Sequence, residues 1–423
     1  MKIKTRTMSY DKVLTLPKAE YFPPQKPSAL LRALAFSLGR EELKDAGFSY
    51  TAQGLDQVKG VPCLILMNHS SFIDLKIASH IFRDRPYNIV CTSDGFVGKR
   101  MLMAKLGCIP TQKFVSDITL IRDIRYALKK LGTSVLMYPE ASYSFDGCPT
   151  PLPRHFGKLL KILDVPVISV LTDGAFLHDP LYNCLQTRKV KVSAEAKLLL
   201  TREQIAEKSV DELDAILDGL FSFDAFASQI KNRVRVDEPF RADGLSRILY
   251  RCPVCGAEGE SEGKGTAITC GACGKTHVLG EYGELSSPGG DPSFPTVSDW
   301  YRWERAQVRA EIENGTYRLE TDVKIGMMVD YKAIYMVGGG HFVHDCTGFR
   351  LTGCGGKLDY RQSPLSSYSL YSDYYWYELG DVICIGGGGT LYYCFPEKKD
   401  VVAKARIAAE ELYKLRKSAV TAR

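Results

Sequence analysis

The sequence of 423 residues lacks any apolar run that approaches the roughly 20 residues of a membrane-spanning helix. Its longest apolar stretches, Val61–Met67 and Val165–Leu171, have the length of β-strands. The first residues, MKIKTRTMSYDKV, contain no apolar core of the kind that a signal peptide needs. From these absences we expect the protein to stay in the cytoplasm.

Neither sign of charge is in large excess in this sequence. It contains 55 Lys and Arg residues and 49 Asp and Glu residues, which gives a net charge of +6. This small charge is compatible with an anionic membrane surface or with anionic substrates, and by itself it does not predict nucleic-acid binding. The length is sufficient for two or three domains.

The 13 cysteines do not form the pattern of a disulfide framework. Four lie in two CxxC pairs, and the others are scattered among apolar neighbours, which is typical of free thiols in a reducing compartment. The pairs, CPVCG and CGACG, predict a zinc ribbon with structural zinc on the thiolates of Cys252, Cys255, Cys270 and Cys273. The acidic segment between the pairs is a poor surface for phosphates, so we expect no nucleic-acid partner.

Strand-like and helix-like runs alternate between residues 60 and 200. This rhythm predicts an α/β fold with a mostly parallel sheet flanked by helices, in which chemistry lies at the carboxyl ends of strands. After residue 300, Tyr-rich segments with glycine turns predict a β-rich region closed by a helix, loosely in the order of a pleckstrin-homology-like module. The predicted parts are an N-terminal extension with an amphipathic helix (1–59), the α/β domain (60–250), the ribbon (251–283), a linker (284–299) and the α+β domain (300–423).

A short helix is predicted to begin after Ser28 and to end at Gly39. Its leucines, at positions 30, 31, 34 and 38, form an apolar stripe near basic residues. Such a helix either packs on the main domain or lies in a membrane interface.

The stretch LILMNHSSFID places His69 and Asp74 directly after a buried strand. On one continuous helix these two side chains would face different directions, because residues five apart are separated by roughly 140°. They can pair if His69 lies in a turn and Asp74 in the first turn of the next helix. The carboxylate would then orient the imidazole, whose other nitrogen could take a proton from a hydroxyl. The alternative is a purely structural role in capping that helix.

Four sequence blocks in the same order resemble the glycerolipid acyltransferases of the lysophosphatidate acyltransferase type. They are NHSSFID, LGCIPTQK, YPEASYS and VPVISV. The resemblance implies that His69 is the general base, oriented by Asp74, and that acyl-CoA or acyl carrier protein is the donor. It also implies an acceptor site with Lys113 as the phosphate ligand and with Glu140, Ser142 and Tyr143 in the acceptor pocket.

Two departures from the family pattern concern the acceptor. Lys113 stands where the family usually has Arg, so a phosphate would meet a point charge without the bidentate fork. Ala141, Ser142 and Tyr143 replace Gly-Thr-Arg, so a second cation is missing. The acceptor is therefore lysophosphatidate-like or another hydroxyl compound.

The sequence favours an O-acyltransferase of bacterial phospholipid synthesis, peripheral on the cytoplasmic membrane. Its partners would be a lipid acceptor, the membrane surface and acyl carrier protein. The alternative is a non-catalytic zinc-ribbon scaffold or regulator whose acyltransferase-like domain only binds lipid.

Overall fold

The computed structural model describes residues 2–115, 117–153, 155–387 and 389–421, and the side chains of these residues up to 418. The chain divides into two compact units. Unit 1 comprises Met1–Glu20, Leu181–Cys184 and Asp237–Arg423, and unit 2 comprises Tyr21–Pro180 and Leu185–Val236. In this division the first 20 residues, predicted as part of the N-terminal extension, and residues 237–250, predicted as part of the α/β domain, group with the C-terminal region.

Unit 2 is built on a seven-stranded sheet whose strands pair in parallel, except for β7 with β8. This confirms an α/β fold with a mostly parallel, mixed sheet. The strand order is β2 (Ser49–Gln53), β8 (Ser193–Leu200), β7 (Val167–Asp173), β3 (Leu64–Met67), β6 (Ser134–Met137), β4 (Tyr87–Thr92) and β5 (Cys108–Thr111). β8 returns antiparallel to β7, and the segment between them contains only short helical turns, the four-residue helix α7 (Ala175–His178) and a 3-10 turn at Leu181–Asn183.

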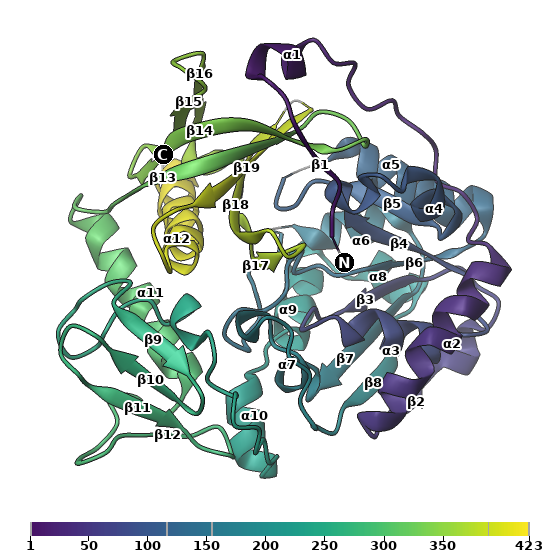
Figure 1. Cartoon of the computed structure of the whole chain (residues 1–423). Coiled ribbons are helices and arrows are strands. Elements are labelled where there is room, and N and C mark those ends of the chain that lie inside the picture. The colour runs from purple at the N-terminus through teal and green to yellow at the C-terminus, as the bar shows by residue number, and fades with distance from the viewer. Residues whose placement is uncertain (1, 116, 154, 388, 422–423) are drawn as a thin grey trace. The chain divides into compact units, whose positions relative to one another are not determined.

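Helices cover both faces of this sheet (Figure 1). Successive side chains of β3 alternate between two cores, so Ile65 and Met67 lie in one cluster and Leu64 and Leu66 in the other. The first cluster includes side chains of α2 (Ala29–Asp45) and α3 (Ile73–Ile81). The second includes side chains of α5 (Ile118–Tyr126), α6 (Phe156–Leu163), α8 (Arg202–Glu207) and α9 (Val210–Leu220). The remaining helices of unit 2 are α4 (Arg100–Lys105) and α10 (Ala225–Asn232).

Helix α2 begins as predicted and ends later than predicted. The Ser28 hydroxyl caps it by accepting a hydrogen bond from the N–H of Leu31. The helix continues to Asp45, so the predicted end at Gly39 is wrong. A Cβ at Gly39 would lie 3.0 Å from the Cβ of Lys76 on α3, so this glycine serves the close packing of two helices.

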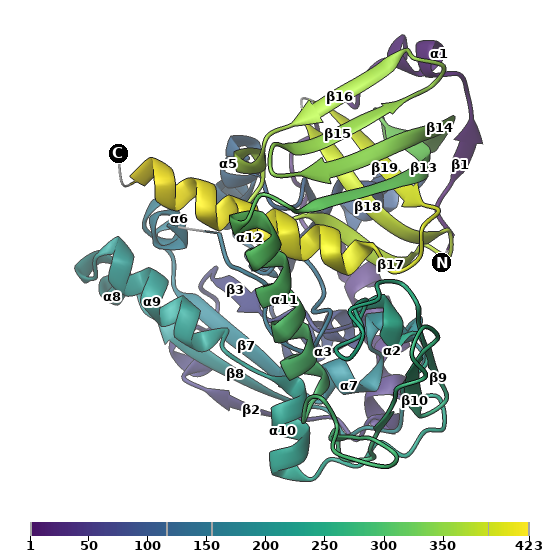
Figure 2. The same cartoon turned by 90° about the vertical axis from the view of Figure 1, so that its left-hand side faces the viewer.

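Unit 1 contains an antiparallel sheet in which β13 pairs with both β14 and β19. Its strands, in spatial order, are β16 (Leu358–Gln362), β15 (Gly348–Gly353), β14 (Ile334–Asp345), β13 (Arg318–Met328), β19 (Thr390–Pro396), β18 (Gly380–Gly387) and β17 (Tyr371–Trp376). Helix α12 (Val402–Thr421) runs beneath the strands and contacts β17, β18 and α11 (Val297–Glu313), as Figure 2 shows. The β-rich region closed by a helix is thus present.

The N-terminal segment also belongs to this unit. Strand β1 (Thr5–Thr7) pairs in parallel with β14, and α1 (Tyr10–Leu14) follows it. The predicted N-terminal extension therefore contributes a strand to the C-terminal sheet.

The cysteine module forms a small antiparallel sheet of its own. Its strands are β9 (Ser261–Lys264), β10 (Ala267–Cys270), β11 (Thr276–Leu279) and β12 (Leu285–Ser286). β12 pairs with β11, and Glu284 bridges to Thr296, so the segment predicted as a linker is largely held against the ribbon. Across the described parts of the chain, no helix combines the length and the apolar character that crossing a bilayer requires.

Candidate active site and metal centre

His69 and Asp74 meet in the arrangement that the sequence allows. His69 lies in the turn after β3, and Asp74 lies in the first turn of α3. The Nδ1 of His69 is 3.1 Å from Oδ2 of Asp74, and the same oxygen accepts the N–H groups of Ser70 at 2.7 Å and Ser71 at 3.1 Å. The two serines thus contribute backbone donors, and the Ser71 hydroxyl donates to the carbonyl of Ala175 and does not cap the helix.

The electrostatics of the pair favour a neutral imidazole. Burial, reinforced by the positive charge of Lys113, holds the pKa of the His69 imidazole well below its usual value. Burial raises the pKa of the Asp74 carboxyl, and the N–H groups of Ser71 and Ser70 act in the opposite direction. Because a carboxylate can only accept, the neutral ring carries its proton on Nδ1, which leaves Nε2 as the basic nitrogen.

Aromatic rings cover both faces of the imidazole. The centroid of the Tyr138 ring lies 3.9 Å from that of His69 with an interplanar angle of 18°, and the Tyr143 ring lies at 4.0 Å and 35°. Phe72 stacks on the outer side of Tyr143 at 5.4 Å. With 14% of the His69 side chain exposed and its Nδ1 edge engaged by Asp74, solvent reaches the ring along the Nε2 edge.

Glu140 is completely buried and holds the backbone of the site. One carboxylate oxygen accepts the N–H of His69 at 3.0 Å, and the other accepts the N–H of Thr150 at 3.0 Å. The resemblance predicts this residue in the acceptor pocket. In the structure its carboxylate accepts two backbone N–H groups, one of them from His69, and so fixes the position of the turn.

The other residues of the resemblance lie around this pair. Lys113 follows β5 and is close enough for its charge to act on His69. Ser142 is buried, and Tyr143 lies against the imidazole. Ala141, which replaces a family glycine, has φ +54°, a left-handed conformation that favours glycine. The loop thus adopts a glycine-type backbone without the glycine.

Two residues of the site were not predicted from the sequence. Tyr138 covers one face of His69, and its buried hydroxyl has no hydrogen-bond partner among the described residues. Asn68 ties the end of β3 to β7, because its Oδ1 accepts the N–H of Thr172 at 2.8 Å while its Nδ2 donates to Ser70. Asn68 is the first residue of the block NHSSFID and Tyr138 the first residue of YPEASYS, and this place in the blocks is the only signal that marked them.

The four cysteines of the ribbon converge on one point. Their Sγ atoms all lie within 4.8 Å of one another, and the Cys252–Cys273 and Cys255–Cys270 pairs are each separated by 3.7 Å. A tetrahedral zinc ion with Zn–S bonds of about 2.3 Å requires sulfur atoms about 3.8 Å apart. The geometry therefore fits a metal held by four thiolates.

The backbone around the cysteines favours thiolates. Gly256 and Gly274, each following the second cysteine of a pair, have φ of +75° and +74°, the tight turn for which the sequence supplies a glycine. Burial alone would raise the pKa of the Cys270 thiol, but the N–H groups of Cys273 and Ala272 and the thiols of Cys252 and Cys255 together lower this pKa to about 7. The pKa of the Cys252 thiol is raised to about 12, chiefly by burial, so the thiolate character is concentrated on Cys270. The turns thus direct N–H groups at the sulfur that a cation would share.

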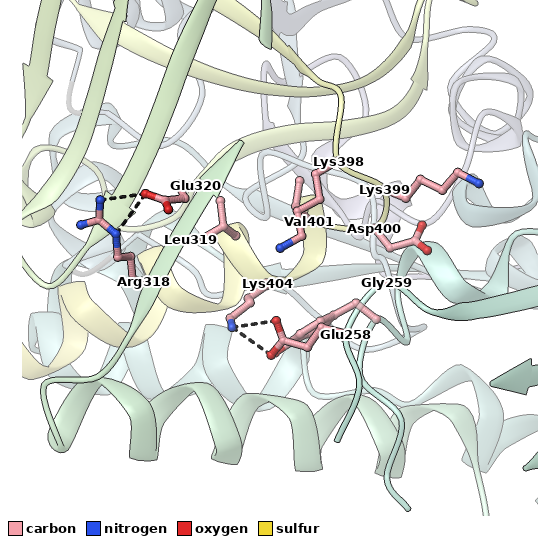
Figure 3. Close-up of a pocket in the computed structure, with 11 residues that line it drawn as sticks. Glu258, Gly259, Arg318, Leu319, Glu320, Lys398, Lys399, Asp400, Val401 and Lys404 are labelled. Atoms are coloured by element: carbon pink, nitrogen blue, oxygen red, sulfur yellow. Dashed lines mark hydrogen bonds and ion pairs between the residues drawn. The ribbon is translucent and has the colours of Figure 1, made fainter. Parts of the chain in front are cut away.

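A cavity of about 240 Å³ in unit 1 lies between the ribbon, the start of β13 and the start of α12 (Figure 3). Lys404 donates to both oxygens of Glu258 at 2.9 Å and lies 3.2 Å from Glu311 on α11. Arg318 contacts Glu320 at 2.7 Å. The ion pairs of Lys404 join the ribbon to α11 and α12, whereas the Arg318–Glu320 pair lies within β13, so this corner of the unit has a structural role.

These observations define unit 2 as an α/β domain with a buried His–Asp pair at a strand end. Residues 49–172 match the family model named Acyltransferase, and this span contains every predicted catalytic and acceptor residue. Residues 49–172 of this chain are thus similar to the acyltransferase family.

Comparison with solved structures found a similarity to the 1-acyl-sn-glycerophosphate (LPA) acyltransferase PlsC from Thermotoga maritima. The two chains share 16% identity over 45% of this chain and 76% of the other, with a TM-score of 0.34. Comparison with curated protein sequences found no match.

Proposed function

We propose that unit 2 transfers a fatty acyl chain from acyl-CoA or acyl carrier protein to the hydroxyl of a lysophospholipid-type acceptor, as a step of phospholipid synthesis. The observation that carries this proposal is the His69–Asp74 pair with an open Nε2 edge, inside the span that matches the acyltransferase family. A neutral imidazole oriented by a carboxylate is the form that removes a proton from an alcohol.

The reaction needs no nucleophile from the protein. Nε2 of His69 takes the proton of the acceptor hydroxyl while the oxygen attacks the thioester carbonyl carbon. The tetrahedral intermediate then collapses, the C–S bond breaks, and the imidazolium returns the proton to the leaving thiolate. Asp74 stabilises the imidazolium between these two proton transfers.

The acceptor site in this proposal has one cation close to the base. Lys113 would hold an anionic group of the acceptor, and its charge already acts on His69. Position 143 offers a ring and not a guanidinium, which supports an acceptor with a single anionic group near the reacting hydroxyl.

Attachment to a membrane surface is part of the proposal, and α2 supports it. Leu30, Leu34 and Leu38 share one side of this helix and are 79%, 51% and 73% exposed, whereas Gly39 on the opposite side packs on α3. The start of α2 adjoins the end of α4, because the N–H of Ser28 donates to the carbonyl of Lys105, and α4 exposes two further apolar side chains. The basic residues beside these side chains, at positions 26, 40, 100 and 105, complement anionic headgroups.

This surface can be tested by vesicle sedimentation. A variant with Leu30, Leu34 and Leu38 changed to Ser should lose binding to anionic phosphatidylglycerol vesicles. The control is Ile162→Ser, on an apolar residue of α6 that is 48% exposed. Equal binding of both variants would place the membrane contact elsewhere.

In unit 1 we propose a structural zinc ion on the four cysteines and a pleckstrin-homology-like arrangement for the C-terminal sheet. The strand order, four strands and then three joined through β13 and β19 with a closing helix, supports that arrangement. Its role would be to help bind lipid headgroups or a partner. The zinc ion would supply no chemistry to the reaction and would fix the ribbon.

The test is a thiol-release assay with acyl-CoA and with acyl carrier protein across a set of hydroxyl acceptors. His69→Ala should lower the rate by about 10²–10⁴-fold. The control is His341→Gln, a half-exposed histidine of unit 1. Activity that survives His69→Ala would refute the base, and no transfer to any acceptor would favour the scaffold role.

A further inference from the structure

The imidazole of His69 lies in a stack of four aromatic rings. From the inside outward the stack contains Tyr138, His69, Tyr143 and Phe72, with centroid separations of 3.9, 4.0 and 5.4 Å. Phe72 is 48% exposed and forms the outer end. General-base catalysis does not require aromatic rings on the two faces of the base, so the stack must be explained by another role of these rings.

We propose that Tyr138 and Tyr143 are positioning residues that clamp the two faces of the general base, so that only its Nε2 edge is presented to the acceptor. This inference rests on the proposed acyl transfer. It assigns Tyr143 to the base and not to the acceptor, although the family pattern places an acceptor-binding cation at that position.

The clamp has a geometric effect. An imidazole turns about its bond to Cβ, and its single hydrogen bond to Asp74 leaves that rotation loosely limited. Rings in contact with both faces restrict the rotation to one plane. In that plane Nδ1 faces Asp74 and Nε2 faces outward, the orientation that a proton transfer from the acceptor needs.

The clamp also has an electrostatic effect. Aromatic faces carry negative charge density and attract an imidazolium more strongly than a neutral imidazole. The rings therefore favour the charged form that exists only while the base holds the proton of the acceptor. Besides the partner within the pair, the charged groups that act on it are Lys113 after β5, which acts on His69, and Glu140 in the loop after β6 and Asp179 after α7, which act on Asp74.

The decisive variants are Tyr143→Phe and Tyr143→Leu. Phe keeps the ring and removes only the hydroxyl. Leu keeps an apolar side chain that still excludes water but removes the aromatic face. Tyr126→Leu is the matched control, because Tyr126 lies at the end of α5 in the same unit and is 40% exposed.

The first measurement is an NMR titration of the His69 imidazole, assigned by loss of its signal in His69→Gln. In Tyr143→Leu the pKa should fall by about 0.5–1 unit, since loss of one aromatic face lowers the proton affinity about three- to tenfold. Tyr143→Phe and Tyr126→Leu should match the wild type. A raised or unchanged pKa in Tyr143→Leu overturns the electrostatic role.

The second measurement is the kinetics of acyl transfer. Tyr143→Leu should lower kcat about tenfold with KM unchanged, and the acidic limb of its pH profile should move down with the imidazole pKa. A raised KM with unchanged kcat, or an equal loss in Tyr143→Phe, would instead assign Tyr143 to the acceptor. The titration needs no activity, so a failure of the clamp and a failure of the proposed acyl transfer give different results.

Discussion

Glu140 offers the sharpest test of what the loop with the third sequence block, YPEASYS, does. The resemblance implies contact with the acceptor, whereas in the structure its two oxygens accept the N–H groups of His69 and Thr150. A hydrogen bond to a buried charged acceptor contributes about 1.5–3 kcal/mol. Glu140→Gln keeps one acceptor oxygen but turns an NH₂ group toward the other N–H, so we expect unit 2 to lose about 2–3 kcal/mol of stability.

The same variant should lower kcat, because the N–H of His69 loses its anchor. A displacement of about 1 Å at a reacting group can lower the rate by about 10²-fold, and KM should stay unchanged. Stability is read by urea-dependent alkylation of Cys63, a buried thiol beside β3. The control is Glu207→Gln, on an exposed glutamate of α8. If Glu140→Gln is as stable as this control and raises only KM, the carboxylate binds the acceptor and our assignment is wrong.

Three further predictions concern strain, pH and metal. Ala141→Gly should leave unit 2 as stable as the wild type or up to about 1 kcal/mol more stable. The left-handed conformation of Ala141 costs about 1–2 kcal/mol, and the greater chain entropy of Gly in the unfolded state offsets part of the gain from removing that cost. A clear decrease in the urea midpoint of Cys63 alkylation would contradict this prediction. Burial lowers the pKa of His344 from 6.5 to about 3, so the unfolded state binds the proton at a higher pH than the folded state does. As the pH falls from 6.5 to 4.5, the free energy of unfolding of unit 1 should therefore decrease by about 2 kcal/mol. His344→Leu should flatten that slope in urea titrations followed by tryptophan fluorescence, which reports unit 1 because all three tryptophans lie there; an unchanged slope would refute the assignment. The purified chain should contain one equivalent of zinc, and either chelation or Cys273→Ser should lower the midpoint of the same transition; a metal-free protein with an unchanged midpoint would refute the zinc site.

The features that sequence predicted well are those fixed by a few neighbouring residues. Capping boxes are of this kind, and Thr201 with Gln204 and Ser209 with Glu212 both form one, because each box needs only the right pair of residues at a spacing of three. The strands of the α/β domain likewise follow from short apolar runs. The pairing of His69 with Asp74 was predictable since both lie within one turn of the same helix start.

The features that sequence missed depend on contacts between distant segments. Gly39 has the pattern of a helix end, but its missing side chain admits Lys76 of a neighbouring helix. Thr5–Thr7 carries no strong strand pattern and becomes a strand because β14 offers it a partner more than 300 residues away. The sequence of each segment does not reveal its distant partner, so neither the continuation of α2 nor the strand at Thr5–Thr7 could be derived from the segment alone.

The structure relates two departures from the family pattern in the block YPEASYS, Ala141 in place of Gly and Tyr143 in place of Arg. Ala141 retains the left-handed backbone of the family glycine, so the loop keeps the path that carries residue 143 to the imidazole. At that place a guanidinium would add a second positive charge to that of Lys113, and two cations beside His69 would lower its pKa further. An aromatic ring has the opposite electrostatic effect, since its face favours the imidazolium. Under the proposed function, the exchange of a cation for a ring would leave Lys113 to hold the negative charge of the acceptor and would make residue 143 part of the environment of the base.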